Sequence, residues 1–108
     1  MPHCYLYTNK KESELKDGIE ERLAKVVADV LGKPLERMVI LVVPGIRMFR
    51  FGTTDPVCSL KISAVNVFDA QRNPTYSPVI RKFLKDELDL PEERCVIVYH
   101  DLDVNFIG

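Results

Sequence analysis

Residues 33–42, with the sequence KPLERMVILV, match residues 90–99, LPEERCVIVY, at one constant offset, and this match indicates that the chain contains a repeated unit. In each stretch a Pro-x-Glu-Arg segment leads into a run of apolar residues rich in Val and Ile. Apolar runs of this length and composition, bounded by residues that favour turns, are typical of strands that are buried on both faces. The chain therefore contains the same turn and strand twice, with strands expected at 38–43 and 95–99.

The segment before each of these strands has the apolar spacing of a helix. Apolar residues three and four positions apart lie on one helical face. At the same offset, such residues pair between the two halves as Leu23 with Ile80, Val26 with Phe83, Val27 with Leu84 and Leu31 with Leu88. Two amphipathic helices are therefore predicted, the first over residues 19–31.

Residues that favour helix ends bound the two helical patterns. Ser13 or Asp17 is expected to cap the start of the first helix, and Gly32 is expected to end it. Ser77 and Pro78 form a suitable N-cap and first-turn pair for the second helix. Pro91 follows that helix and prevents its continuation.

Each half of the chain therefore has the order β-α-β, because residues 3–8 and 57–67 supply a first strand before each helix. The helix joins two parallel strands by a right-handed crossover. Two such units side by side predict an α/β fold, a four-stranded mixed sheet with two helices on one face. The whole chain, 1–108, forms a single domain.

One face of this sheet is left without a cover. The strands at 38–43 and 95–99 are apolar on both faces, whereas the two helices cover only one. An extended apolar surface on a protein indicates an interface, most simply with another copy of the chain. Oligomerisation is therefore expected.

The composition excludes several classes of protein. The 108 residues are 46% hydrophobic and carry 15 basic and 16 acidic side chains, for a net charge of −1. A chain of this length does not need disulfide bonds or a bound metal to fold, and it buries about two-thirds of its unfolded surface. Because basic residues are not concentrated anywhere, nucleic-acid binding is not expected. No apolar signal core or membrane-spanning run is present, so we expect no membrane insertion and a cytoplasmic location.

The cysteines and histidines do not form a metal-binding pattern. Cys4, Cys58 and Cys95 have no Cys-x-x-Cys spacing and are interpreted as reduced structural thiols. His3 and Cys4 are adjacent on a strand and point to opposite faces, so they do not share a metal. We therefore predict no metal and no cofactor.

The dipeptide Met1-Pro2 is the main candidate for chemistry. Methionine aminopeptidases remove an initiator that is followed by a small residue, which would leave Pro2 with a free secondary amine. An α-amino group titrates near 7.7–8.0, and burial or a nearby cation lowers its pKa, so this amine can act as a general base. The alternative is that proline is second by chance.

Lys33, at the end of the first helix, is the second candidate. It stands in a favourable position for a solvated lysine at a helix C-terminus, which is the alternative to a functional role. Its counterpart in the second half is Leu90, however, so the turn itself does not require a lysine.

An ordered set of motifs resembles the macrophage migration inhibitory factor and D-dopachrome tautomerase family, over the whole chain. The motifs are Met1-Pro2, Thr8-Asn9, Asp17-Gly18, Leu31–Pro34, Val42–Pro44, the loop Phe51–Pro56, Tyr76-Ser77 and the closing segment 101–108. The resemblance implies a tautomerase-like domain that assembles into a homotrimeric barrel with active sites between subunits.

The resemblance also implies an activity and a set of site residues. Pro2 would be the catalytic base of a keto–enol tautomerase whose small-molecule substrates are phenylpyruvate-like enols or dopachrome-like compounds. Lys33 would bind the substrate carboxylate, the backbone of Val65 would contact substrate, and Ile107 would form an apolar wall.

The chain departs from the family pattern at several of these positions. The tyrosine and asparagine that a neighbouring subunit supplies in the migration-inhibitory branch are Val96 and Val98 here, as in the dopachrome branch. Val98 therefore offers substrate no side-chain hydrogen bond, and a missing donor of this kind costs about 10²-fold in rate. An aromatic position near the second strand is Arg37. The chain also stops at Gly108, before the tail that walls the family's pocket, so we expect weak activity.

The sequence is compatible with three functions. The first is the tautomerase. The second is a non-catalytic, cytokine-like ligand that leaves the cell without a signal peptide and binds a cell-surface receptor. The third, outside the family, is a ferredoxin-like binding module, which has the same β-α-β-β-α-β order and would make Pro2 incidental.

Overall fold

The computed structural model describes residues 1–108, and its elements follow the predicted β-α-β-β-α-β order. The strands and helices are β1 (His3–Thr8), α1 (Ile19–Leu31), β2 (Val39–Val43), β3 (Cys58–Ala64), α2 (Asn73–Leu88) and β4 (Cys95–Asp101). In the sheet the strand order is β2-β1-β3-β4. Strand β1 is parallel to β2, β3 is parallel to β4, and β1 and β3 are antiparallel. The predicted duplicated unit and mixed sheet are confirmed.

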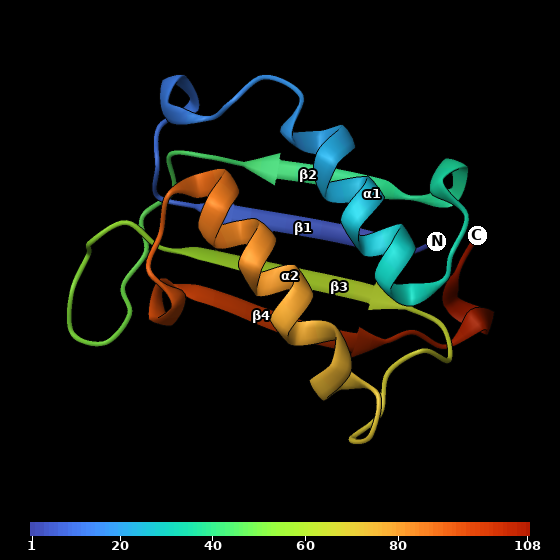
Figure 1. Ribbon diagram of the computed structural model, residues 1–108. Helices are drawn as coiled ribbons and strands as arrows, with labels where there is room; N and C mark the ends of the chain where they lie inside the picture. The colour runs from blue at the N-terminus through green and yellow to red at the C-terminus, as the bar shows by residue number, and fades with distance from the viewer.

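Both helices lie side by side on one face of the sheet (Figure 1). The core lies between these two layers and includes Leu6 and Leu60 from the sheet and Leu23 and Ile80 from the helices, all fully buried. A two-bond ion pair joins the helices, because Arg22 donates from Nε and Nη2 to the two carboxylate oxygens of Glu87 at 2.7 and 2.8 Å. Neither helix is long and apolar enough to span a bilayer.

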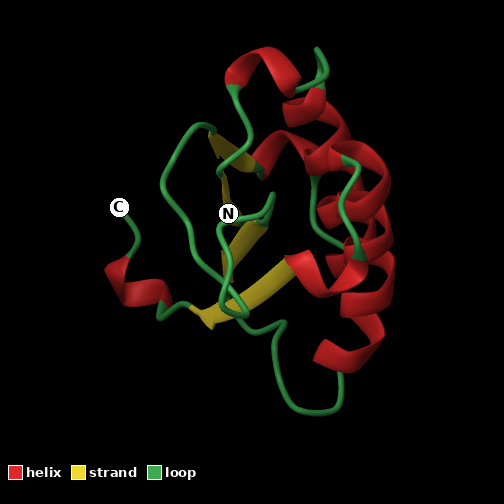
Figure 2. Cartoon of the chain, turned by 90° about the vertical axis from the view of Figure 1, so that its left-hand side faces the viewer, coloured by secondary structure: helices red, strands yellow, loops and turns green.

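The face of the sheet turned away from the helices, here named the open face, has no covering element in a single chain (Figure 2). On β2, Val39 and Leu41 are each 40% exposed. This exposure agrees with the expectation that a single chain leaves one face of the strand at 38–43 uncovered; its burial by another copy stays a prediction. The strand register gives the open face three rows of four residues: Val39, His3, Ser63 and His100; Leu41, Tyr5, Lys61 and Val98; Val43, Tyr7, Ser59 and Val96.

The start of α1 differs from the prediction. Neither Ser13 nor Asp17 caps it, because the N-cap position falls on Gly18, whose φ of +83° is left-handed and suits glycine. Asp17 contributes through its backbone instead, since its carbonyl accepts a 2.8 Å hydrogen bond from Nη1 of Arg22. Gly32 ends the helix as predicted, with a left-handed φ of +66°.

The start of α2 also differs, because Ser77 and Pro78 lie inside the helix rather than at its beginning. The Asp69 carboxylate accepts hydrogen bonds from the backbone N–H groups of Gln71 and Arg72, which fixes the turn earlier in the chain. Ser77 donates from its hydroxyl to the carbonyl of Asn73 at 3.2 Å. The helix therefore begins soon after the Asp69 turn and includes Pro78 within it.

Candidate active site

Pro2 lies at the end of the sheet where β1 begins. Its carbonyl accepts a 2.9 Å hydrogen bond from the N–H of Val39, which fixes the N-terminal residues against the start of β2. The side chain of Pro2 is fully buried, and Met1, on its N-terminal side, is half-buried. The alternation along β1 directs Pro2 toward the helices with Cys4, while His3 belongs to the open face, as predicted.

Lys33 reaches the same end of the molecule through the turn that ends α1. Its N–H donates to the carbonyl of Ala28 at 3.0 Å, closing the helix after Gly32. A 3₁₀ turn, Leu35–Arg37, then leads into β2, whose first residue is hydrogen-bonded to Pro2. The ammonium group of Lys33 forms no hydrogen bond or ion pair, and the residue is half-buried.

Val65 directly follows β3 and lies beside the N-terminus. The antiparallel register of β1 and β3 ends at His3 and Ser63, so Pro2 and Val65 lie just beyond the same end of these two strands. The carbonyl of Ala64 is held by the N–H of Leu102 at 2.8 Å. Val65 is half-buried, and its backbone is part of this sheet end.

Ile107 follows the 3₁₀ turn Val104–Phe106 in the C-terminal segment and is half-buried. Figure 1 shows the C-terminus at the same end of the sheet as the N-terminus. Figure 2 shows that this segment extends to the open-face side, away from the helices. The fold therefore gathers Pro2, Lys33, Val65 and the segment of Ile107 at one end of the sheet.

Val98 is the exception among the predicted site residues. It lies in the middle of β4, opposite Lys61, and is 46% exposed on the open face. Val96 belongs to the same face one row further from Pro2. Within a single chain, Val98 and Pro2 are therefore not brought together.

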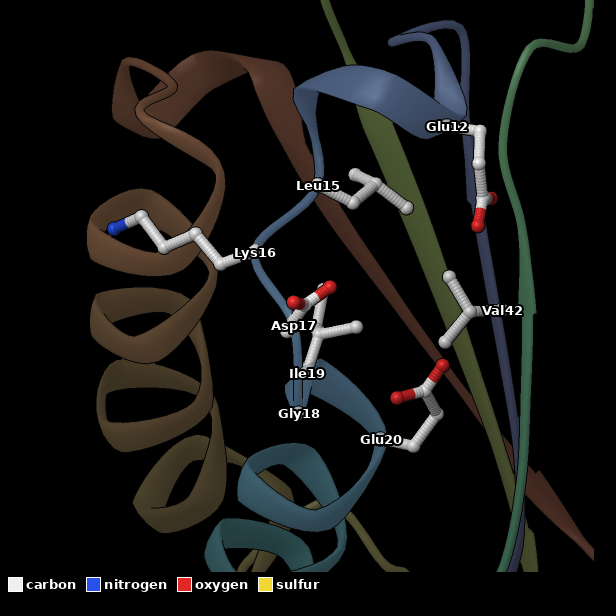
Figure 3. A pocket seen from close by; sticks show the side chains of 8 residues that line it. All are labelled: Glu12, Leu15, Lys16, Asp17, Gly18, Ile19, Glu20 and Val42. Carbon is white, nitrogen blue, oxygen red and sulfur yellow. The ribbon is translucent and has the colours of Figure 1, made fainter.

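The hollows of the single chain lie away from Pro2. One, of about 190 Å³, is formed at the start of α1 by Glu12, Leu15, Lys16, Asp17, Gly18, Ile19, Glu20 and Val42 (Figure 3). The other lies beside the loop at Asp55 and the turn after α2. Neither includes a predicted site residue. Within one chain, neither hollow opens at Pro2.

Arg94 has a role that the sequence comparison of the two halves did not indicate. It is 6% exposed, and its guanidinium donates to the backbone carbonyls of Pro56, Arg50 and Asp55 at 3.1, 2.7 and 2.7 Å. Its counterpart in the first unit, Arg37, is exposed and has no side-chain hydrogen bond or ion pair. The arginine at this position therefore holds a loop in the second unit and has no hydrogen-bond partner in the first.

The three cysteines are free thiols buried in the core. Burial raises the pKa of the Cys4 thiol to about 12. Cys58 and Cys95 are register partners on β3 and β4, and the nearby Cys95 thiol together with burial raises the pKa of Cys58. Cys58 and Cys95 lie at the opposite end of the sheet from Pro2, whereas Cys4 is two residues after it on β1.

A family model described as macrophage migration inhibitory factor matches residues 1–108, the entire chain. The chain belongs to this family. Mouse (Mus musculus) D-dopachrome decarboxylase is 35% identical over 109 residues, covering 100% of this chain and 92% of the relative. The MIF-like protein mif-2 of Caenorhabditis elegans is 32% identical, covering 100% and 90%. The macrophage migration inhibitory factor of Xenopus tropicalis is 29% identical, covering 100% and 94%.

The solved structures agree on the fold of this family. The macrophage migration inhibitory factor of Trichinella spiralis superposes with a TM-score of 0.93 at 20% identity, over 98% of this chain and 94% of that one. The predicted family resemblance is therefore confirmed. Because the match extends over the whole chain, an unrelated ferredoxin-like module no longer describes it.

Proposed function

We propose that the protein is a keto–enol tautomerase in which the amine of Pro2, freed by removal of Met1, is the general base. The supporting observation is the convergence of Pro2, Lys33 and Val65 at one end of the sheet, although they are far apart in the sequence. Family membership over residues 1–108, with D-dopachrome decarboxylases among the relatives, is consistent with chemistry on small carbonyl compounds.

Removal of Met1 is essential to this mechanism. While Met1 is attached, the nitrogen of Pro2 belongs to a peptide bond and has no basic lone pair. Once Met1 is removed, it is a secondary amine on a buried residue. Burial and the cation of Lys33 both favour the neutral amine and so lower its pKa toward neutral pH.

In the proposed reaction the Pro2 amine removes a proton from the carbon next to a substrate carbonyl. The C–H bond breaks, its electron pair forms the C=C double bond while the carbonyl π pair moves onto the oxygen, and the proline nitrogen carries the proton until that oxygen takes it. The proton has then moved to a different atom, and the amine is neutral again. Lys33 binds the substrate carboxylate, the backbone of Val65 contacts the substrate, and Ile107 provides an apolar wall.

The proposed active unit is a homotrimer with its sites between subunits. The open face presents apolar side chains such as Val39, Leu41 and Val98, and burying them against neighbouring copies is favourable by about 25 cal/mol per Å². Val98 of a neighbouring subunit would then line the site as an apolar surface without a hydrogen-bond donor. We therefore expect a lower rate than in an enzyme with a donor at this position.

A second proposed function is that of a cytokine-like ligand for a cell-surface receptor. It is supported by the match to the migration inhibitory factor family. The protein would then be cytoplasmic and leave the cell by a route that uses no signal peptide. Absence of the protein from the medium of intact producing cells would exclude this function.

The tautomerase is tested with purified protein whose N-terminus is verified by mass spectrometry. Wild-type protein should lack Met1 and catalyse phenylpyruvate tautomerisation. Pro2→Gly, which preserves Met1 removal but replaces the proline amine, should lose most of kcat. Lys33→Ala should mainly raise KM, whereas Lys25→Ala, on the exposed side of α1, should change neither. Equal activity of wild type and Pro2→Gly would refute the mechanism.

Several relatives are named decarboxylases, so a further measurement should distinguish decarboxylation from tautomerisation. The two reactions differ in the fate of the substrate carboxylate. Product mass from a D-dopachrome assay shows whether CO₂ leaves. In a tautomerisation the carboxylate is retained and only a proton moves. Loss of CO₂ without any phenylpyruvate tautomerisation would assign the chain to decarboxylation instead.

A further inference from the structure

The hollow at the start of α1 suits a single cationic side chain. Leu15, Ile19 and Val42 contribute its apolar part. Figure 3 shows the carboxylates of Glu12 and Glu20 directed toward Val42 from opposite sides. The volume of about 190 Å³ is below the roughly 300–1,000 Å³ of small-molecule sites, so one long side chain fits the hollow better than a small-molecule ligand.

The two carboxylates at this hollow have no partner in their own chain. Neither Glu12 nor Glu20 takes part in an ion pair, and neither side chain accepts a hydrogen bond. Lys16, the cation that lines the hollow, extends away from both carboxylates (Figure 3). Two negative charges that face one hollow repel each other unless a cation lies between them. The hollow is therefore complete only with a positive group from outside it.

The segment Ile46–Phe51, which follows β2, carries a cation without a partner. Arg47 is exposed and forms no ion pair or side-chain hydrogen bond. Phe49 and Phe51, in the same segment, are 73% and 68% exposed. Exposed aromatic side chains beside an arginine are typical of surfaces that contact another protein.

Hydrogen bonds hold this segment in a defined position. At its start, the N–H of Ile46 donates to the carbonyl of Thr8 at 3.2 Å. At its end, Arg50 and Thr53 exchange two backbone hydrogen bonds of 3.0 and 3.1 Å, and Arg94 donates to the carbonyl of Arg50. Because the segment is already ordered, little conformational entropy is lost when it binds a partner.

A second copy of the chain carries the group that the hollow lacks. The hollow includes Val42 on β2, which is an edge strand with no neighbour on its outer side. Unpaired strand edges and exposed apolar surfaces both favour contact with another chain. The apolar stem of an arginine suits Leu15 and Ile19, and its planar guanidinium can bind two carboxylates at once.

We propose that Arg47 of a neighbouring copy occupies this hollow, with its guanidinium between the carboxylates of Glu12 and Glu20. This inference rests on the homotrimer of the proposed function and names a contact that holds it together. The segment and the hollow are different surfaces of the chain, so each copy gives its arginine to one neighbour and receives one from the other. A head-to-tail contact of this kind closes into a ring.

Subunit exchange tests the contact, because a weakened interface mainly dissociates faster. Unlabelled and ¹⁵N-labelled protein are mixed, and native mass spectrometry follows the appearance of mixed trimers. Arg47→Glu should exchange at least about tenfold faster than wild type, and so should Glu12→Lys/Glu20→Lys, which reverses the charge of the hollow. Combining all three substitutions restores opposite charges and should bring the exchange rate back to within about threefold of wild type.

The control is Lys25→Glu, which reverses a charge on the exposed side of α1 and should leave the exchange rate unchanged. Wild-type exchange in Arg47→Glu, or no recovery in the combined variant, with circular dichroism showing the native fold in each, would overturn the inference. Binding of agmatine, a free organic cation, to wild-type trimer and its loss in Glu12→Lys/Glu20→Lys would show that the hollow stays open in the assembly, which also overturns it.

The outcomes separate this inference from the proposed function. A wild-type trimer whose exchange ignores these charge reversals would refute the inference alone. A wild-type monomer would refute the homotrimer and the inference together. Pro2→Gly should lose activity and keep the wild-type exchange rate, so a charge-dependent trimer without tautomerase activity would refute the tautomerase alone.

Discussion

Replacing Arg94 by Met tests how the second unit holds the loop between β2 and β3. The guanidinium of Arg94 donates three hydrogen bonds to the carbonyls of Arg50, Asp55 and Pro56, and methionine keeps the length of the side chain without a donor. Hydrogen bonds to a charged group contribute about 1.5–3 kcal/mol each. Their sum is reduced because the loop carbonyls can bind water and because an unpaired buried cation is itself unfavourable.

We therefore expect Arg94→Met to lower the free energy of unfolding by about 2–4 kcal/mol. With an m-value of about 1–2 kcal/mol per M, the urea midpoint should fall by about 2 M. Denaturation is followed by far-UV circular dichroism at fixed protein concentration, since association would couple to unfolding.

The duplication supplies a matched control. Arg37 occupies the same position in the first unit but is exposed and has no partner, so Arg37→Met should change stability by no more than about 0.5 kcal/mol. Arg94→Lys should fall between wild type and Arg94→Met, because a lysine ammonium is a point donor that does not reproduce the fork of the guanidinium. Equal effects of Arg94→Met and Arg37→Met would refute the assignment of Arg94 as the anchor of this loop.

Three further predictions concern the helices and the thiols. The hydrogen bond from Arg22 holds the pKa of Glu87 below its ordinary value of 4.5, so the stabilisation is present above that pH and is lost as the pH falls through the lowered pKa. Urea melts should therefore separate wild type from Glu87→Gln at pH 7, and the difference should shrink as the pH is lowered below 4.5. A difference that stays constant with pH would contradict this. Gly18→Ala should lower the stability more than Gly32→Ala. Both glycines have positive φ, but a Cβ at Gly18 would lie 2.9 Å from Nη1 of Arg22, while nothing lies within 4 Å of a Cβ at Gly32. Thermal melts compare the two variants, and equal losses of stability would show that backbone strain alone sets the cost. Iodoacetamide at pH 8 should alkylate no cysteine in the native protein and all three in urea. All three thiols are buried, and burial raises the pKa of Cys4 to about 12. Alkylation of the native protein, measured by mass spectrometry, would contradict this.

The sheet and helices were predictable because apolar periodicity is a local signal that recurs in both halves. The match of residues 33–42 with 90–99 predicted the repeated turn and strand, and the apolar spacing before each strand predicted the two helices. The helix starts were not predictable in the same way. Ser77 and Pro78 have the residue types of a helix start, but the Asp69 carboxylate turns the chain earlier.

The candidate site was predictable only in part. Pro2 and Lys33 are recognisable by type and position, and the fold brings them to one end of the sheet. The difference between Arg37 and Arg94 was not predictable, because the two lie at equivalent positions in the sequence and differ only in which loop carbonyls are within reach. The place of Val98 depends on strand register, and a single chain leaves it on the open face, away from Pro2.

Blocking the free amine of Pro2 shows whether this amine is the catalytic base. Inserting one Ala between Met1 and Pro2 leaves, after Met1 removal, an Ala-Pro N-terminus in which the proline nitrogen is an amide. General acid–base catalysis contributes about 10²–10⁴-fold, so kcat/KM for phenylpyruvate should fall by at least about 10²-fold. Retention of wild-type kcat/KM in the extended protein, with the mass confirming Ala at its N-terminus, would contradict the account.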